Sequence, residues 1–280
     1  MKTPVMTDHL RQRVRWGSGA LLVLVLGLFV FAKVFTPLSQ DRAQALLEKR
    51  FIPALLNGVA PVGYPIDRGA PVALLEIQDI NLRQIVVEGT EAEDLAKGPG
   101  HLVGSALPGQ PGTSAILGHA SRFGSSFSRL EELQSGQEIN ITTAQGVHTY
   151  EVVDSTVRSA NDSAAFIGER NMLLLITGVG GSSPDQRLVV RALLTSPVFP
   201  AGTPATDVKT STSELGLSGS DDSPLQLAIW LILLLFLVVS IFPLIEKIGR
   251  RVTWTIAVPL LVVVLFQVWQ NAALMFPAIG

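Results

Sequence analysis

Histidine moves protons readily near neutral pH, and this chain of 280 residues has only four histidines. His119 follows the short apolar stretch TSAIL and a glycine, and His101 lies in the glycine- and proline-rich loop GPGHLVGSALPGQPG. His148 lies in a predicted hairpin and His9 in the N-terminal tail, and we expect both to be exposed to solvent. The spacing of the four does not match a metal-binding pattern such as HExxH, so we predict no metal and no cofactor.

A nucleophile is harder to find than a base. The chain has no cysteine, which excludes disulfides, cysteine-ligated zinc or iron–sulfur clusters, and a cysteine nucleophile. The stretch LLLITGVGG, at 173–181, is typical of a buried strand that runs into a glycine-rich loop. Catalytic groups often lie at such strand ends, yet Gly178 has no side chain. The hydroxyls of Thr177, Ser182 and Ser183 are weak nucleophiles unless a base activates them.

The composition indicates a membrane protein. The mean hydropathy is +0.41, and only 16% of the residues are charged. Three apolar stretches, at 17–37, 224–245 and 252–276, are long enough to cross a bilayer. Arginines precede the first stretch and the basic loop EKIGRR joins the other two, so the positive-inside rule places the segment 38–223 outside the cytoplasm of a multi-pass protein of the cytoplasmic membrane. The net charge of −2 and the lack of a basic patch argue against nucleic-acid binding.

The segment between the first two apolar stretches is predicted to form one mostly-β domain. Short apolar or alternating runs such as QEINIT and RLVVRALL are separated by glycine and proline, and an amphipathic helix, QDRAQALLEKRF, precedes them. A stretch rich in serine, threonine, proline and glycine follows and is typical of a flexible linker. The predicted divisions are a cytoplasmic tail at 1–16, a transmembrane helix at 17–37, a helical lead-in at 38–72, the β domain at 73–195, a linker at 196–223, a transmembrane helix at 224–245, a cytoplasmic loop at 246–251 and a transmembrane helix at 252–276.

The order of these motifs resembles a known family. The loop around His101, then TSAILGHASRFGSSFSRLEELQSGQEINI, and then a hairpin ending in TYEV are similar to the sortases, especially their class D and E groups. The resemblance covers 73–194, and its most specific part is AILGHASRFGSSFSRLEELQSGQEI. Sortases are membrane-anchored transpeptidases, so the resemblance implies a mostly-β fold, a closed β-barrel with short helices, to which three transmembrane helices are added here.

The resemblance also implies a site. Sortases use the histidine of a Gly-His pair at the end of a strand, a cysteine that ends a TLxTC strand, and an arginine on the next strand. His119 and Arg187 fall on the histidine and arginine positions, but Gly178 stands where the cysteine is expected. Thr177 matches the threonine of the motif and His101 matches a histidine that these groups often carry, so both are candidate binding residues. Arg187 would either bind the substrate backbone and the developing oxyanion or hold the strand-end loop through a carboxylate or carbonyls.

Without the cysteine, the expected site lacks the group that forms a covalent intermediate. Strand alternation turns Thr177 to the opposite face, so it is a poor replacement. We therefore predict a sortase-like protein without transpeptidase activity that binds a polypeptide segment or a membrane-protein partner at the cell surface. The alternatives are an active acyltransferase or hydrolase with a serine or threonine nucleophile, and a structural subunit of a membrane complex. Gln267, Gln270 and Asn271 share one face of the last helix and favour contacts with another helix, in this chain or in a partner.

Overall fold

The structure is a computed structural model that describes residues 36–121, 123–159, 162, 166, 168, 171–179, 186–203 and 223–274. The predicted cytoplasmic tail, the first predicted transmembrane stretch up to residue 35, most of the predicted linker, and Ser182 and Ser183 lie outside these residues. The helices and strands are α2 (Thr36–Leu56), β1 (Pro71–Ile77), β2 (Leu82–Glu88), α3 (Ala92–Leu95), β3 (Gly100–His101), β4 (Thr113–Leu117), β5 (Glu138–Thr143), β6 (Gly146–Ser159), β7 (Met172–Val179), β8 (Gln186–Leu194), α4 (Ser223–Ile248) and α5 (Arg250–Leu274).

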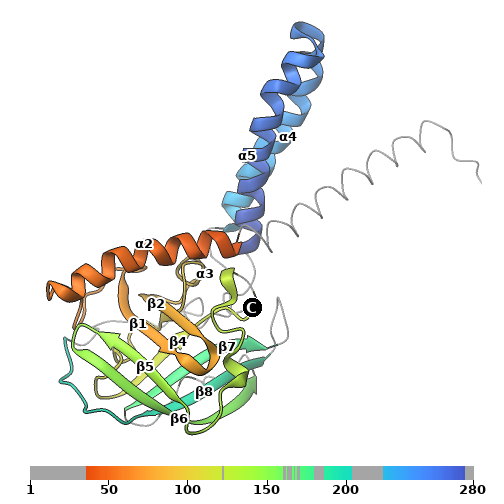
Figure 1. Cartoon of the computed structure of the whole chain (residues 1–280). Coiled ribbons are helices and arrows are strands. Elements are labelled where there is room, and N and C mark those ends of the chain that lie inside the picture. Colours follow the sequence, from red (N-terminus) through yellow and green to blue (C-terminus); the bar gives the residue numbers. More distant parts are fainter. Residues whose placement is uncertain are drawn as a thin grey trace, which may run out of the picture.

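The strands close into a barrel in the order β1-β2-β3-β4-β7-β8-β6-β5, with β5 pairing back onto β1 (Figure 1). The pairs β2–β3 and β4–β7 are parallel, and the other neighbours are antiparallel. Closure pairs the strands all round and so removes the exposed edges that an open sheet would have. The prediction of a mostly-β closed barrel with short helices is confirmed.

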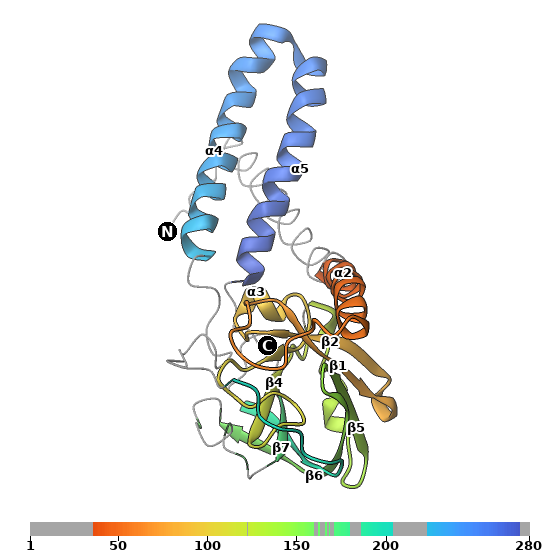
Figure 2. The same ribbon diagram turned by 90° about the vertical axis from the view of Figure 1, so that its left-hand side faces the viewer.

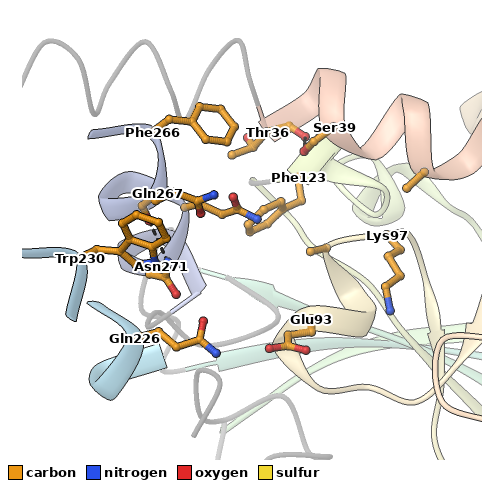
Figure 3. Close-up of a pocket in the computed structure, with 13 residues that line it drawn as sticks. Thr36, Ser39, Glu93, Lys97, Phe123, Gln226, Trp230, Phe266, Gln267 and Asn271 are labelled. Atoms are coloured by element: carbon orange, nitrogen blue, oxygen red, sulfur yellow. Dashed lines mark hydrogen bonds between the residues drawn. The ribbon is translucent and has the colours of Figure 1, made fainter. Parts of the chain in front are cut away.

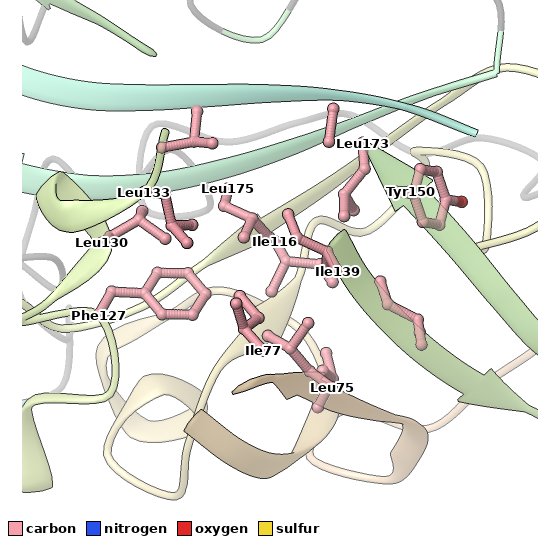
Figure 4. Packing of buried hydrophobic residues seen from close by; sticks show 14 of the residues in the cluster. Leu75, Ile77, Ile116, Phe127, Leu130, Leu133, Ile139, Tyr150, Leu173 and Leu175 are labelled. Carbon is pink, nitrogen blue, oxygen red and sulfur yellow. The ribbon is translucent and has the colours of Figure 1, made fainter. Parts of the chain in front are cut away.

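The interior of the barrel is filled by apolar side chains (Figure 4). Leu173 and Leu175 of β7 pack there against Ile116 of β4. Phe127 and Leu130, from the segment that follows β4, belong to the same cluster. This cluster joins residues that lie far apart in the sequence, and its burial is the main force that holds the barrel closed.

The outer face of β4, β7 and β8 carries a second apolar cluster. Leu174 and Ile176 of β7 point to this side and pack with Leu117 of β4, Val189 of β8 and Leu95 of α3. β7 is therefore covered on both faces. This double burial explains why the sequence of β7 is continuously apolar rather than alternating.

Helix α2 lies over the outside of β1 and β2 (Figure 2). Leu47 and Phe51 are buried against Ile85 of β2. The side-chain amide of Gln44 accepts a hydrogen bond from the N–H of Ile85 at 2.7 Å and donates to the carbonyls of Ile85 and Lys97 at 3.0 and 2.8 Å. These contacts pair backbone groups of β2 with α2, which extends beyond the predicted amphipathic stretch at both ends.

Helices α4 and α5 pack side by side as a long apolar hairpin that rises from one end of α2 (Figure 1). Within the described residues, these are the helices whose length and composition suit a membrane span. The six-residue loop predicted at 246–251 is instead helical except at Gly249, whose φ of 87° makes the turn. The connection is therefore much shorter than expected.

Residues after β8 pack on the barrel up to the end of their described part, in contrast to the flexible linker predicted there. The N–H of Phe199 donates to the carbonyl of Gly109 at 2.9 Å, and the ring of Phe199 makes an edge contact with His148. The prediction that His148 is exposed is wrong, because its side chain is fully buried and its Nε2 lies 2.8 Å from Thr143 Oγ1. Burial also lowers the pKa of His148 below its usual value.

Candidate functional site

Neighbouring strands bring His119, Gly178 and Arg187 together. In the antiparallel β7–β8 ladder, Gly178 lies directly opposite Arg187. β4 runs parallel to β7 on the other side, with Leu117 beside Ile176. The backbone N–H that follows Leu117 donates to the carbonyl of Ile176 at 3.1 Å, so the pairing continues past the end of β4 toward His119. Gly178 is therefore flanked by His119 on one side and Arg187 on the other.

The three positions face the same side of the sheet. Arg187 is two residues before Val189, and His119 is two residues after Leu117, and both of these apolar residues belong to the outer cluster. Gly178 continues the outward-facing series of β7. Because strand side chains alternate with a period of two, a side chain at position 178 would point outward between the imidazole and the guanidinium.

Arg187 is held in an apolar setting at this site. Its side chain is only 1% exposed, and its guanidinium carbon lies 4.9 Å from the centre of the Phe166 ring. Burial lowers the pKa of Arg187 to about 10, while the charge of Asp162 acts in the opposite direction. The guanidinium therefore stays positive at neutral pH, and the aromatic ring over it contributes a cation–π attraction. Phe166 also packs against the outer apolar cluster, so it covers part of the face that the site uses.

The His119 imidazole lies in a tightly constrained loop. It is 2% exposed, and its ring centre is 5.1 Å from that of Phe123. Phe123, Gly124 and Ser125 all have positive φ angles, of 45°, 72° and 52°, which is costly for a bulky residue such as phenylalanine. Such a backbone persists only where its surroundings hold it. One such restraint is the Gln40 amide of α2, which donates to the hydroxyl of the next residue, Ser126, at 2.7 Å.

The same loop contacts the C-terminal helix hairpin. Phe123 is buried in a small cluster with Ala273 of α5, and Trp269 of α5 and Ala96 pack against them. One aromatic side chain thus separates the imidazole of His119 from α5. The sequence resemblance located His119 but contained no sign of this contact, because residues 123 and 273 are brought together only by the tertiary structure.

Thr177 lies on the opposite face of β7 from the site. Its hydroxyl donates to the carbonyl of Gly118 at 2.8 Å, and its side chain is 3% exposed. A pocket of about 180 Å³ opens beside the strand end and is lined by Ala120, Phe127, Ser128, Glu131, Thr177, Gly178, Val179 and Leu188. The hydroxyl of Thr177 is thus used to tie β7 to the end of β4, while the pocket offers a mixed apolar and polar recess next to Gly178.

His101 belongs to a separate buried network. It pairs with Ile116 across the β3–β4 ladder, and Ile116 faces the barrel interior, so His101 lies on the opposite face from His119. Its Nδ1 is 2.9 Å from the carboxylate of Glu88, and both side chains are fully buried. The hydroxyl of Tyr64 donates to the other carboxylate oxygen of Glu88 at 2.8 Å. The structure therefore does not bring His101 to the His119 site.

Ser105 completes a Ser-His-Glu arrangement in this network, yet its contacts hold the loop in place and do not prepare a nucleophile. Ser105 Oγ lies 2.9 Å from Nε2 of His101. The same hydroxyl donates to the carbonyl of Leu102 at 2.8 Å and accepts from the N–H of Ala115 at 3.3 Å. Nε2 of His101 is also 3.0 Å from the carbonyl of Ala106. A carbonyl only accepts hydrogen bonds, so this contact suits an Nε2 that carries a proton and not one that acts as a base toward Ser105. The network fastens the loop after β3 to the barrel.

The polar face predicted on the last helix lines a cavity of about 700 Å³ between α2, α3, the Phe123 loop and the helix hairpin (Figure 3). Asn271 is buried and its amide donates to the carbonyl of Gln267 at 2.8 Å. The cavity is lined by Thr36, Ser39, Ala43, Glu93, Ala96, Lys97, Phe123, Gln226, Trp230, Phe266, Gln267, Gln270 and Asn271. The polar face of α5 therefore lines a cavity together with polar residues from other elements of the same chain.

The fold and the site define a closed eight-stranded barrel with a histidine and an arginine on either side of one strand end. Residues 75–195 match the family model of the sortase domain. Sortase D of Bacillus subtilis (strain 168) is 33% identical over 113 residues, which cover 40% of this chain and 56% of that relative, so the chain spans about half of the relative's length.

Two solved structures are also similar. A sortase D5 transpeptidase of Clostridium perfringens is 23% identical with a TM-score of 0.48, and the match covers 55% of this chain and 99% of that one. A sortase C of Clostridium perfringens, solved with the C-terminal cell wall sorting motif, is 22% identical with a TM-score of 0.45, and the match covers 55% and 89%. The barrel domain of the chain therefore matches the sortase domain, and the resemblance found in the sequence is confirmed.

Proposed function

We propose that this protein is a membrane-anchored member of the sortase family that binds a polypeptide segment outside the cytoplasm and has no transpeptidase activity. The observation that carries the proposal is Gly178, which lies opposite Arg187 and toward His119 in a chain without cysteine. The flanking base and cation are kept while the nucleophile is absent. Such a site can still bind a peptide backbone through the arginine, but it cannot form a thioacyl intermediate.

The hydroxyls of Thr177 and Ser105 support the same view. Thr177 donates its proton to a backbone carbonyl and lies on the far face of β7 from the site. Ser105 is likewise bonded to a carbonyl and belongs to the His101 network. A hydroxyl that donates to a carbonyl and lies away from His119 has no base positioned to activate it.

The membrane placement rests on α4 and α5. Both are long and apolar enough to cross a bilayer, and most of their large apolar side chains are exposed. The tip of the hairpin carries Lys247, Arg250 and Arg251, and the positive-inside rule assigns such a tip to the cytoplasm. The barrel, at the other end of both helices, then lies outside.

The bound segment is expected to belong to a membrane protein and to lie close to its membrane-spanning part. His119 contacts Phe123, and Phe123 packs on Ala273 in the last turn of α5. If α5 crosses the bilayer, the site lies only a few side chains from the outer surface. A juxtamembrane segment of a partner would reach it without leaving the membrane.

The test uses the full chain in detergent with a fluorescent peptide that carries a C-terminal cell wall sorting motif, the motif present in the sortase C structure. We expect the peptide to be retained without cleavage, and mass spectrometry to show no covalent adduct. Arg187→Met, which removes the guanidinium opposite Gly178 on the face that also holds His119, should abolish retention. Val147→Arg, at an exposed position at the opposite end of β6, is the matched control and should not.

Two results would contradict the proposal in different ways. Cleavage of the peptide that disappears in His119→Ala would show an active enzyme and favour a serine or threonine nucleophile. Equal peptide retention by the wild type and Arg187→Met would show that the peptide does not use the site at Gly178, and would favour a structural role in a membrane complex.

A further inference from the structure

Helix α2 has an outward face that combines cations with exposed apolar side chains. Leu38, Leu46 and Leu56 are 61%, 51% and 82% exposed. Arg42 and Lys49 are exposed and lie between them in the sequence. Successive positions are three, four or seven residues apart, and each of these spacings returns to the same side of an α-helix. The five residues therefore form one stripe along the helix. We call these five residues the outer stripe of α2.

The outer stripe points away from the barrel. Leu47 and Phe51, on the opposite side of the helix, are buried against β1 and β2. α2 runs across the direction of α4 and α5, at the level where this hairpin meets the barrel (Figures 1 and 2). Its first turns share the cavity of Figure 3 with Trp230 of α4 and Phe266 of α5. The stripe is thus turned toward the side from which the hairpin rises.

The charge of α2 on this side is positive. Glu48 is neutralised by Arg83, at 2.8 Å. In the part of the chain that the structure describes, Arg42, Lys49 and Arg50 have no ion pair within the barrel or its helices. These three cations exceed the one remaining carboxylate of the helix, that of Asp41. The charge therefore complements an anionic surface.

We propose that α2 lies on the surface of an anionic bilayer, with its leucines at the boundary of headgroups and acyl chains and its cations at lipid phosphates. The proposal rests on the membrane placement of α4 and α5 proposed above. A helix with leucines and cations in one stripe suits an interface, where both kinds of side chain find partners at the same depth. A buried protein interface would instead leave Arg42 and Lys49 desolvated without counter-charges.

This contact would attach the barrel along the membrane surface, in addition to the transmembrane segments. α2 is joined to the site through the Gln40–Ser126 hydrogen bond, at 2.7 Å, and through the loop that holds Phe123. A helix seated on the bilayer would fix the height and tilt of His119 and Gly178 above the membrane. The site would then select polypeptide segments at one distance from the membrane surface.

The test uses the full chain in vesicles and takes advantage of its lack of native cysteine. A fluorophore is attached to Leu46→Cys and quenched by lipids that carry a nitroxide at the headgroup. The matched control is Leu193→Cys, an exposed leucine on β8, on the far side of the barrel from β1 and β2. Vesicles are of phosphatidylcholine, alone or mixed with phosphatidylglycerol. A label at Leu233→Cys of α4, quenched by nitroxides deep in the acyl chains, reports separately on the membrane span.

We expect strong quenching at Leu46→Cys, more in vesicles with phosphatidylglycerol, and little at Leu193→Cys. The double variant Arg42→Gln and Lys49→Gln should lower the equilibrium constant for binding of α2 to the anionic vesicle surface by about 30-fold, since each cation contributes about 1 kcal/mol at such a surface. Equal quenching at Leu46→Cys and Leu193→Cys, with Leu233→Cys quenched, would overturn the proposal and leave the membrane span intact. Protection of Leu46→Cys without lipid quenching would also overturn it and indicate a second protein chain. Lack of quenching at Leu233→Cys would refute the membrane span itself.

Discussion

The substitution Gly178→Cys tests the geometry of the site most directly. Position 178 lies opposite Arg187 and its side chain would point to the face that also holds His119. The Arg187 guanidinium is buried and, with a pKa of about 10, remains positive at neutral pH. A thiol placed beside a buried cation loses its proton more easily, because the thiolate is stabilised by the positive charge.

The size of the effect follows from the strand geometry. Directly opposite residues have Cβ atoms about 5 Å apart. If the thiolate and the guanidinium come to a similar separation, the attraction of the two unit charges at an effective dielectric constant of about 20 is about 3 kcal/mol. This corresponds to about two pKa units, and burial of the thiolate opposes part of it. We therefore expect the pKa of the new thiol to fall from about 8.5 to about 7.

The assay is the pH dependence of alkylation by iodoacetamide, with Leu193→Cys as the exposed control. The midpoint of the rate profile is the main readout, because limited access slows a buried thiol equally at every pH. Near pH 6.5 the thiolate fraction should rise roughly 20-fold, and the weaker nucleophilicity of an acidic thiol reduces the gain in rate per accessible thiol to roughly fivefold. His119→Ala in the same background should move the midpoint upward.

A midpoint at or above that of Leu193→Cys would refute this reasoning. It would mean that the charge of Arg187 does not act at position 178, and the assignment of Gly178 to the lost nucleophile would fail. A lowered midpoint that is indifferent to His119→Ala would contradict only the part of the argument that concerns the histidine.

Other expectations concern the pairing, the pH response and the topology. Glu88→Ala should lower the free energy of unfolding by about 3–5 kcal/mol, measured by denaturant titration, because it leaves the buried His101 without its carboxylate. Burial lowers the pKa of His148, so as the pH falls the unfolded chain binds a proton at this histidine before the folded protein does. Acid therefore favours unfolding, and the melting temperature should fall more steeply below about pH 6.5 in the wild type than in His148→Gln. An impermeant thiol reagent should label Leu193→Cys in intact cells or spheroplasts, and should label Lys247→Cys only after lysis; the reverse pattern would invert the proposed topology.

The sequence by itself determined the parts of this protein that depend on neighbouring residues. The apolar runs of α4 and α5 predicted long spans, because composition over one stretch decides whether it can cross a bilayer. The run LLLITG predicted a buried strand ending at Gly178. The absence of cysteine and the resemblance around His119 together predicted a site without its nucleophile, and neither step needed coordinates.

The tertiary structure decided which faces are covered and which side chains meet. His148 is polar and lies in a hairpin, a pattern that predicts exposure, yet Phe199 and Gly109 come from distant segments to bury it. Glu88 carries no local sign that it pairs with His101, because the parallel β2–β3 register alone places them side by side.

The contact of Phe123 with α5 depends likewise on where two separate elements come to rest. Local sequence patterns record the preferences of a residue within one strand or one helical turn. Burial and pairing between elements depend on their packing, and that packing is set by the whole core at once.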